Sequence, residues 1–426
     1  MVTDSIKLVM RAAALLHANG QTTQRVVTET TRLGKTLGLQ VEVLPQWDAI
    51  FFRYRPTDAD PSAVWQHDVI SVKPTGVDMN KVALITTWIE GLSGHQPPRS
   101  REQLTQLYKE LESIAAQKAS SDLRFTLMAG LGASALGLIF GVTSLATLVL
   151  IFTAAVIGAL ARRVLGRMTD NLFIQPFLAA LVAGLVGGVA QHLFKGTELQ
   201  FVDIAPCMIL VPGAHILNAS LDLARGRIGL GWSRLIYCTL ILMSICTGLL
   251  VGLMLVDASL AQGMVSTTVP LWLDIASAGV AVAAFGAFFS LPWRMLIAPV
   301  AVGMACHASR WWVLEQGQGV VLGAFIACLI AGTVTALLAR RLKLPFAALA
   351  FGAVVSMMPG IFVFKMASGL IDVYLAGDQA TLSMLTNLFA HGTATFLIVM
   401  VMTFGLIFPK MLIDGWLGKE TCKPSK

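Results

Sequence analysis

Charged residues are scarce in this sequence of 426 residues. Asp, Glu, Lys and Arg together make up 13%, whereas 56% of the residues are hydrophobic and the mean hydropathy is +0.73. Soluble domains carry about 25% charged residues, so the shortage argues against a soluble multidomain enzyme and against a disordered chain. Catalytic signatures are also lacking. There is no HExxH, GxSxG or Walker A pattern, which argues against a nucleotide-hydrolysing pump on this chain.

Cysteine is rare and never forms a CxxC pair. Five of the six cysteines lie in apolar runs, and we interpret them as small packing residues. No metal and no cofactor is therefore expected. We do not expect the first 20 residues to be a signal peptide, because their apolar stretch is short and is interrupted by Arg11. We expect the N-terminus to lie in the cytoplasm.

The net charge of +7 is confined to one part of the chain. Residues 1–123 carry 13 basic and 13 acidic residues, whereas residues 124–426 carry 18 basic and 11 acidic residues. In the second part the basic residues fall between long apolar runs. This pattern is typical of a membrane protein and not of a nucleic-acid-binding face.

Residues 1–123 predict a small cytoplasmic α+β domain. Helical periodicity covers 5–38, with a turn at Asn19-Gly20 and an end at Gly38. Further helices are predicted at 78–91 and 101–118, where Ser100 and Gln103 resemble a capping box. Runs rich in β-branched and aromatic residues predict strands at 41–43, 49–54 and 68–72, and 96–99 reads as a hinge.

The remainder predicts an α-helical membrane domain of about ten transmembrane helices, divided into 124–262 and 263–426, the latter with a short cytoplasmic tail. Several spans are close to the 20 residues that cross a bilayer. The predicted spans are 125–143, 145–161, 171–191, 201–223, 235–256, 271–289, 293–309, 318–339, 345–371 and 385–408.

Basic residues orient these spans. With residue 1 inside, 15 of the 18 basic residues fall at cytoplasmic ends and loops, including Arg225, Arg227 and Arg234 before the fifth span. Only Lys195 and Arg310 fall outside, and Lys365 lies within a span. This split predicts that both termini are cytoplasmic.

An internal repeat is indicated by two Pro-Gly pairs in mid-span. Pro212-Gly213 and Pro359-Gly360 are 147 residues apart, and the same offset relates several span starts. Five spans per copy would invert the second copy, giving the inverted 5+5 repeat found in secondary transporters. Proline and glycine interrupt a helix, and the exposed backbone groups are tolerated only in protein or beside a wet cavity. Two ordinary proline kinks remain the alternative.

Polar residues follow both breaks. His215, Asn218 and Asp222 follow the first, and Lys365 follows the second at the position equivalent to Asn218. Ionisable groups within spans are functional candidates, and the imidazole of His215 could carry coupling protons. Elsewhere, His307 and His391 lie near span ends, where packing or solvated roles are favoured. Asp203 and Asp274 begin spans, where an acid suits a helix N-terminus.

Two stretches resemble the threonine/serine exporter family of bacterial membrane proteins. One is Gly20-Gln21-Thr22-Thr23-Gln24-Arg25-Val26, between the first two helices. The other is Val211-Pro212-Gly213 followed by Asn218, Asp222 and Gly226, similar to a VPG-x4-N-x3-D-x3-G pattern. The second half resembles the family's partner module, here fused to the first.

The resemblance implies a bacterial inner-membrane secondary transporter that exports L-threonine, L-serine or similar molecules using the proton gradient. Part of the family exports dicarboxylates, so that alternative stays open, and His215 and Lys365 match no family motif. We expect a small-molecule substrate, protons and lipid as partners, and no nucleic acid; a homo-oligomer is left open. A membrane enzyme acting through residues 1–123, or a passive channel or scaffold, is the weaker alternative.

The expected substrate site lies between the two Pro-Gly breaks. Free helix N-termini would attract a carboxylate, Asn218 would offer an amide, Lys365 would balance negative charge and Asp222 would pair with an ammonium group. The predicted site residues are Pro212, Gly213, His215, Asn218, Asp222, Pro359, Gly360 and Lys365.

Overall fold

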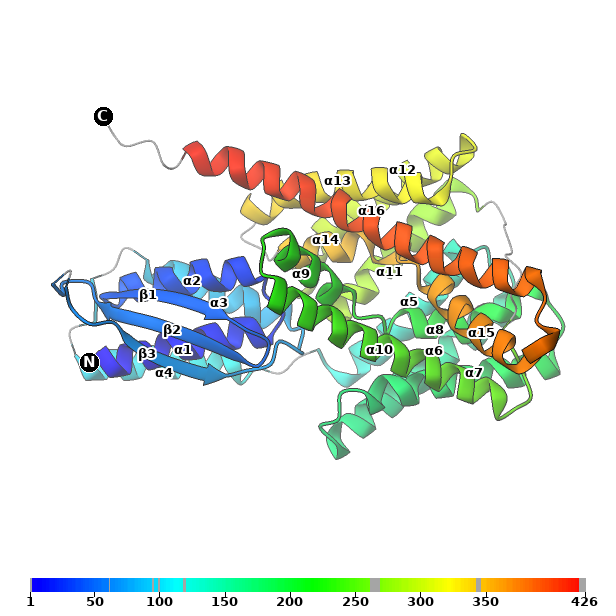
Figure 1. Cartoon of the computed structure of the whole chain (residues 1–426), viewed down its shortest axis with the longest axis horizontal. Coiled ribbons are helices and arrows are strands. Elements are labelled where there is room, and N and C mark those ends of the chain that lie inside the picture. The colour runs from blue at the N-terminus through cyan, green and yellow to red at the C-terminus, as the bar shows by residue number, and fades with distance from the viewer. Residues whose placement is uncertain are drawn as a thin grey trace.

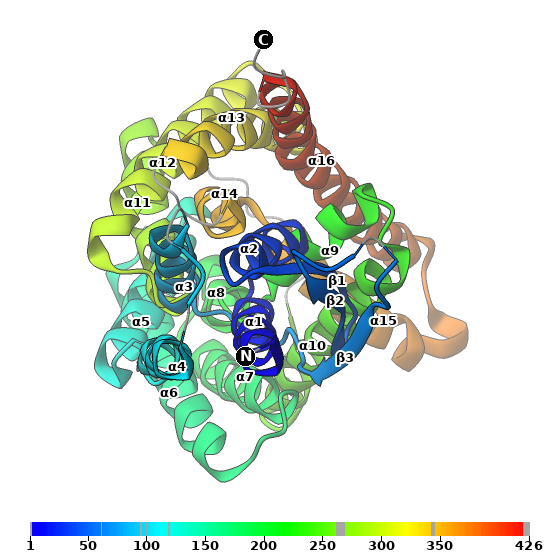
Figure 2. The same cartoon turned by 90° about the vertical axis from the view of Figure 1, so that its left-hand side faces the viewer.

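The computed structural model describes residues 2–60, 62–93, 96–98, 100–117, 120–260, 269–341 and 346–420. A small α/β unit at the N-terminus caps one end of a larger assembly of helices (Figure 1). Seen from that end, helices α1 and α2 lie in front of the middle of the helical assembly (Figure 2).

The N-terminal unit contains a three-stranded antiparallel sheet in the order β1-β2-β3. Its strands are β1 (Leu39–Pro45), β2 (Ala49–Pro56) and β3 (Gln66–Ser71), and its helices are α1 (Val2–Ala18), α2 (Thr23–Thr36), α3 (Met79–Leu92) and α4 (Arg101–Ala115). Burial alternates along β1, as expected for a strand with one face on a core. The predicted strands and helices are therefore present. Of the predicted hinge 96–99, residue 99 lies outside the described residues.

Two sequence signals in this unit are explained by the structure. Gly38 follows α2 with φ of +75°, a conformation that glycine adopts without the steric penalty of a side chain. The Ser100 hydroxyl accepts a hydrogen bond from the backbone N–H of Gln103 at 3.2 Å, which caps α4.

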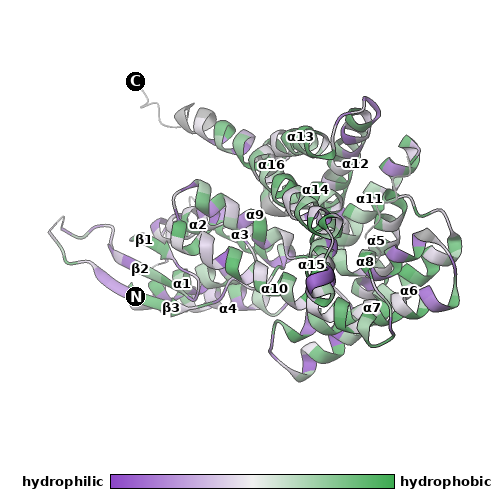
Figure 3. Cartoon of the chain, turned by 45° about the vertical axis from the view of Figure 1, so that its right-hand side comes forward, coloured by the Kyte–Doolittle hydropathy of each residue, from purple (hydrophilic) through white to green (hydrophobic). Residues whose placement is uncertain are grey.

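The remaining helices consist largely of hydrophobic residues (Figure 3). The helices are α5 (Asp122–Ile139), α6 (Leu145–Met168), α7 (Ile174–Leu193), α8 (Gln200–Met208), α9 (Gly213–Ala224), α10 (Ile228–Met254), α11 (Leu271–Phe288), α12 (Trp293–Glu315), α13 (Val320–Arg341), α14 (Phe346–Val354), α15 (Gly360–Ala376) and α16 (Leu382–Glu420). Short 3-10 turns η1 (Thr197–Leu199), η2 (Val355–Met357) and η3 (Gly377–Gln379) connect some of them.

Eight of these helices are long and apolar enough to cross a membrane, among the residues that the structure describes. The pair α8 and α9, bent by 52°, adds a ninth when the two are taken as one span. The chain is therefore a helical membrane protein. Helix α12, expected as a span at 293–309, has 23 residues but is not among these, so the count of ten stays a prediction.

The two halves of the membrane domain have the same order of helices. The starts of α5 and α11, α6 and α12, α7 and α13, α8 and α14, and α9 and α15 are 149, 148, 146, 146 and 147 residues apart. Packing partners also correspond, because α6 contacts α5, α7 and α8, as α12 contacts α11, α13 and α14. The inverted orientation of the second half stays a prediction.

One boundary differs from the prediction in a way that matters for the site. α10 begins at Ile228 rather than at residue 235, so Arg234 lies inside this helix and not in a loop before it. Its side chain is fully buried, at 0% exposure. The sequence pattern misled because a single arginine flanked by Ser233 and Leu235 looks like the end of an apolar run, whereas its charge is balanced by a distant carboxylate.

Candidate functional site

The two Pro-Gly breaks lie against each other at the centre of the membrane domain. A methyl group placed on Gly213 would lie 1.9 Å from Phe351 and 2.8 Å from the sulfur of Met358, both in the second half. A methyl group on Gly360 would lie 3.0 Å from Met208, which precedes the first break. The breaks at Pro212-Gly213 and Pro359-Gly360 are thus close in space, and the absence of a side chain at Gly213 allows the approach.

Asp222 lies in a buried polar cluster at the end of α9. Its carboxylate pairs with Arg234 at 3.2 Å and with Arg227 at 3.5 Å. It also accepts a hydrogen bond of 2.8 Å from the hydroxyl of Thr23, in the N-terminal unit. Two guanidinium groups and a hydroxyl therefore already neutralise and solvate this carboxylate.

Asn218, one turn earlier on α9, also contacts the N-terminal unit. Its side-chain amide donates to the backbone carbonyl of Gly20 at 3.1 Å. Nearby, Arg227 donates to the side-chain oxygen of Gln24 at 2.6 Å. The loop that contains Gly20 to Arg25 thus sits directly on the polar face of α9.

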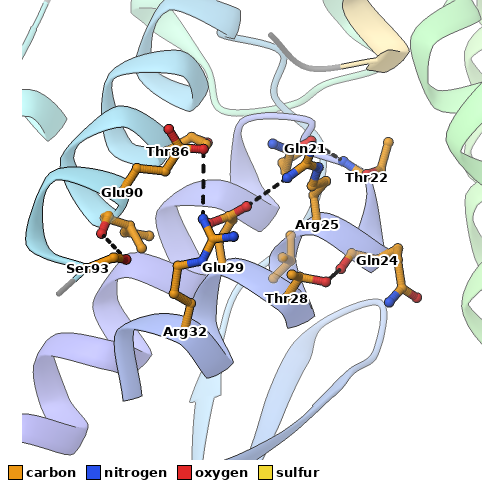
Figure 4. A network of polar contacts seen from close by, with 12 residues as sticks. Gln21, Thr22, Gln24, Arg25, Thr28, Glu29, Arg32, Thr86, Glu90 and Ser93 are labelled. Carbon is orange, nitrogen blue, oxygen red and sulfur yellow. Dashed lines mark hydrogen bonds and ion pairs between the residues drawn. The ribbon is translucent and has the colours of Figure 1, made fainter. Parts of the chain in front are cut away.

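A network inside the N-terminal unit holds this loop in place (Figure 4). Glu29 is fully buried and pairs with Arg25 at 2.9 Å and with Arg32 at 3.0 Å. Arg32 also lies 3.8 Å from Glu90 on α3. The network joins the start of α2 to α3, and α3 in turn meets the membrane domain where the N–H of Met79 donates to the carbonyl of Phe289 at 2.9 Å.

Lys365 is fully buried in a second cluster, at the opposite end of the α8–α9 pair. Its ammonium group lies 3.4 Å from the side-chain oxygen of Gln200, and it interacts electrostatically with the buried Asp203. Asp203 accepts a hydrogen bond of 3.2 Å from Gln191 on α7. Lys365 thus faces the first turn of α8, whereas Asp222 faces the N-terminal unit, so the predicted site residues fall into separate clusters.

A third buried group joins Asp274, His307 and Ser356. The Nδ1 atom of His307 lies 3.0 Å from the carboxylate of Asp274, and its Nε2 atom lies 2.6 Å from the hydroxyl of Ser356. All three side chains are buried. Asp274 and His307 were each expected to have a separate role near the end of a span, and no role was predicted for Ser356. The three lie 33 and 49 residues apart, and no local pattern links them.

A cavity of about 220 Å³ opens beside the first break. Pro212, Ala214 and His215 form part of its wall, and the N-terminal unit contributes residues 75–77. Its polar lining side chains are Thr75, Arg162, Gln175, His215 and Tyr237.

Arg162 is the cation of this cavity. Its guanidinium carbon lies 5.9 Å from the ring centres of Phe125 and Phe288. No carboxylate lies within ion-pair distance of it in the part of the chain that the structure describes. A half-buried arginine without a carboxylate partner, beside a helix N-terminus, can bind a carboxylate ligand. Arg162 is one of the 15 basic residues that predict the orientation of the spans, and no role in a site was predicted for it.

His215 lies across the same cavity. Its ring meets that of Tyr237 edge-on at 5.4 Å, and Tyr237 also contacts Trp47 of the N-terminal unit at 5.2 Å. The Nδ1 atom of His215 is buried and has no hydrogen-bond partner among the described residues. Such an atom is available to a polar ligand.

No group of three or more His, Cys, Asp or Glu side chains in the described residues is arranged to hold a metal ion.

Comparisons with known proteins identify two family models that match successive parts of the chain. A family model described as "Putative threonine/serine exporter" matches residues 7–256, and a second, described as "Threonine/Serine exporter, ThrE", matches residues 274–412. The boundary between them falls between α10 and α11. No curated protein and no solved structure matches the chain.

Proposed function

The chain belongs to the threonine/serine exporter family, and we propose from this that it exports L-threonine, L-serine or closely similar small molecules from the cytoplasm in exchange for protons. The family is one of membrane transporters, and both of its models match here in a single chain. Dicarboxylates such as succinate are the alternative substrates. The proposed location is a bacterial inner membrane with both termini in the cytoplasm.

The cavity beside the first break carries the proposal. At about 220 Å³ it is smaller than the roughly 300–1,000 Å³ of sites for drug-sized ligands, and so suits a molecule the size of a small amino acid. Arg162 would bind the carboxylate in a bidentate manner. The N-terminus of α9, which enters the wall at Ala214, would add its positive end. The remaining polar groups of the substrate would form hydrogen bonds with Tyr237, Gln175 and Thr75.

The other predicted site residues take roles that follow from their positions. Pro212, Gly213 and His215 belong to the break and cavity of the first half, and Pro359 and Gly360 form the opposing break. Asn218 and Asp222 would hold the N-terminal unit against α9. Lys365, near Asp203, would meet the substrate on the outward side when one half rocks against the other.

Counterflow in proteoliposomes tests the substrate class. Purified protein is preloaded with unlabelled threonine, serine or succinate, and entry of the labelled compound is followed. We expect exchange of threonine and serine. Exchange of succinate alone would move the assignment to dicarboxylates, and no exchange of any of the three would refute the proposal.

The variants Arg162→Gln and Arg163→Gln test the site. Arg163 is the neighbouring residue on α6, but it pairs with Asp122 at 2.9 Å and does not line the cavity. Hydrogen bonds to charged groups contribute about 1.5–3 kcal/mol, and about 1.4 kcal/mol corresponds to a factor of ten. Loss of the carboxylate contact in Arg162→Gln should therefore raise the KM for exchange at least about tenfold. Arg163→Gln should stay within about threefold. Equal effects of the two substitutions would remove Arg162 from the site.

A further inference from the structure

We propose that Asp274, His307 and Ser356 form the proton-binding site that couples export to the proton gradient. The proposal rests on the proposed function, and it assigns the coupling proton to the second half of the chain, away from the cavity of the first half. His307 takes up and releases the proton, Asp274 fixes the orientation of its ring, and Ser356 passes the change of protonation to the second break.

The geometry fits a single-proton site. Asp274 comes from the first turn of α11, His307 from the middle of α12 and Ser356 from the 3-10 turn η2. The imidazole is fully buried and contacts an acceptor on one side and a hydroxyl on the other, at 3.0 Å and 2.6 Å. Histidine is the side chain whose charge most readily changes near neutral pH.

The neighbouring helices supply few other titratable groups. α12 itself adds Cys306 and the half-buried Arg310, which interacts electrostatically with Asp274. α13 adds Cys328, whereas α14 carries no ionisable residue in its sequence. The Cys306 thiol donates to the carbonyl of Ala327 at 3.3 Å and so has its own partner. Asp274, which contacts His307, and Arg310, which interacts with Asp274, are therefore two fixed charges near the imidazole.

Protonation reverses the hydrogen bond between His307 and Ser356. An ionised carboxylate only accepts hydrogen bonds, so Nδ1 of His307 carries a proton directed at Asp274. Nε2 of the neutral ring then accepts from the Ser356 hydroxyl. When a proton from the outer solution binds Nε2, both ring nitrogens donate, and the hydroxyl hydrogen of Ser356 must turn to another acceptor. Release of that proton towards the cytoplasm restores the first arrangement, and one proton has moved opposite to the substrate.

Ser356 is placed to convey this reversal to the substrate path. It lies three residues before Pro359, in the turn that leads into the second break. Met358, two residues after Ser356, places its sulfur against the position of Gly213 in the first break. A change of hydrogen bonding at Ser356 therefore acts on the contact between the two breaks.

The site belongs to one half only. Subtracting the repeat offset of 147 residues from Asp274, His307 and Ser356 gives Leu127, Leu160 and Ile209, all of them apolar. The first half has the cavity with Arg162, and the second half has the buried imidazole. This division assigns substrate binding to one half and proton binding to the other.

Two transport assays on reconstituted full-length protein separate coupling from substrate exchange. Counterflow at equal pH on both sides needs no net movement of protons, whereas accumulation driven by an imposed pH gradient does. With the membrane potential held at zero, exchange of one zwitterionic amino acid for one proton under a gradient of about one pH unit supports roughly tenfold accumulation of substrate. The variants are His307→Gln and Ser356→Ala. The control is His391→Gln. His391 is also buried, but it lies on α16 and packs against Phe362 of α15.

We expect His307→Gln to keep counterflow within about threefold of the unmodified protein, while its accumulation ratio under the pH gradient falls to about one. Ser356→Ala should lower the accumulation ratio at least about threefold, and His391→Gln should accumulate substrate like the unmodified protein. Full gradient-driven accumulation by His307→Gln would overturn the proposal.

If His307→Gln is not monodisperse in detergent, the accumulation assay on Ser356→Ala tests the proposal in its place. Unaltered gradient-driven accumulation by Ser356→Ala would also overturn the proposal. An unmodified protein that exchanges substrate but shows no gradient-driven accumulation would instead refute proton coupling as a whole, and the proton site with it.

Discussion

Replacing Gly213 with alanine tests whether the two Pro-Gly breaks pack against each other. The added methyl carbon would lie 1.9 Å and 2.0 Å from two ring carbons of Phe351, and 2.8 Å from the sulfur of Met358. Gly360→Ala is the matched control in the other break. There the nearest atoms all belong to Met208, the closest at 3.0 Å.

The two substitutions should lower the free energy of unfolding by different amounts. Non-bonded carbon atoms pack at about 3.5–4.0 Å, so the Phe351 ring would have to move by about 1.5 Å or more. Phe351 is buried, and overpacking of this kind costs about 1–3 kcal/mol. Alanine is favoured over glycine in helices by up to about 1 kcal/mol, which offsets part of that cost. The flexible side chain of Met208 should accommodate Gly360→Ala for less than about 1 kcal/mol.

Thermal unfolding of purified protein in detergent measures the difference. For a chain of 426 residues, 1 kcal/mol shifts the unfolding temperature by about 1 °C, so we expect Gly213→Ala to unfold roughly 1–3 °C below the unmodified protein and Gly360→Ala to stay within about 1 °C of it. A double variant with Phe351→Leu should recover part of the loss, because leucine lacks the two ring carbons that meet the new methyl group. Equal unfolding temperatures for the two single variants, or no recovery in the double variant, would refute the contact between the breaks.

Three further predictions concern the junction between the N-terminal unit and the membrane domain. Asp222→Asn leaves the fully buried Arg234 without a carboxylate and should lower the free energy of unfolding by about 3–5 kcal/mol. The control Asp414→Asn removes a partly exposed partner of Lys410 and should lower it by about 1 kcal/mol or less. Thermal unfolding compares the two variants, and equal losses of stability would contradict the pairing of Asp222 with Arg234. Thr23→Val removes a hydrogen bond to the charged Asp222, which contributes about 1.5–3 kcal/mol, and should therefore raise the rate of amide hydrogen exchange in the loop before α2. The hydroxyl of Thr28 bonds only within its own helix, so Thr28→Val should leave that rate unchanged. Burial, and secondarily Arg234, lowers the pKa of His17 from 6.5 to about 3, against a hydrogen bond to the carbonyl of Gln46. The folded protein holds this imidazole neutral, so its contribution to stability is complete above about pH 6.5 and is lost at about 1.4 kcal/mol per unit as the pH falls towards about 3. The unfolding temperature should therefore drop less between about pH 7 and pH 5 in His17→Gln than in the unmodified protein, and parallel curves would contradict this reasoning.

Local structure was largely predictable because it depends on local patterns. The strand expected at 49–54 is β2, Ala49–Pro56, and the Pro-Gly pairs mark the starts of α9 and α15. Hydrophobic periodicity and helix-breaking residues report on the backbone within a few residues. The starts of corresponding helices could be compared across the two halves for the same reason.

The polar clusters were not predictable, because each is assembled from segments distant in sequence. Lys365 and Asn218 occupy equivalent positions in the two halves, which suggested a shared site, yet Lys365 interacts with α8 and Asn218 with the N-terminal unit. Arg162 fell at the expected end of its span, but α6 continues to Met168 and places the guanidinium in the cavity wall. Periodicity contains no information about such long-range contacts.

The two stretches that carry the family resemblance meet in space. Gly20 and Thr23 of the first stretch bond to Asn218 and Asp222 of the second. Both stretches are therefore constrained by one interface, and the polar residues after the first break need no direct contact with the substrate to explain their chemistry. In the proposed orientation, the N-terminal unit covers the cytoplasmic end of α9, and its residues 75–77 form part of the cavity wall. A substrate leaving the cytoplasm must then pass this interface, so weakening the bond between Thr23 and Asp222 should change the rate of export from the cytoplasmic side more than the affinity of the cavity.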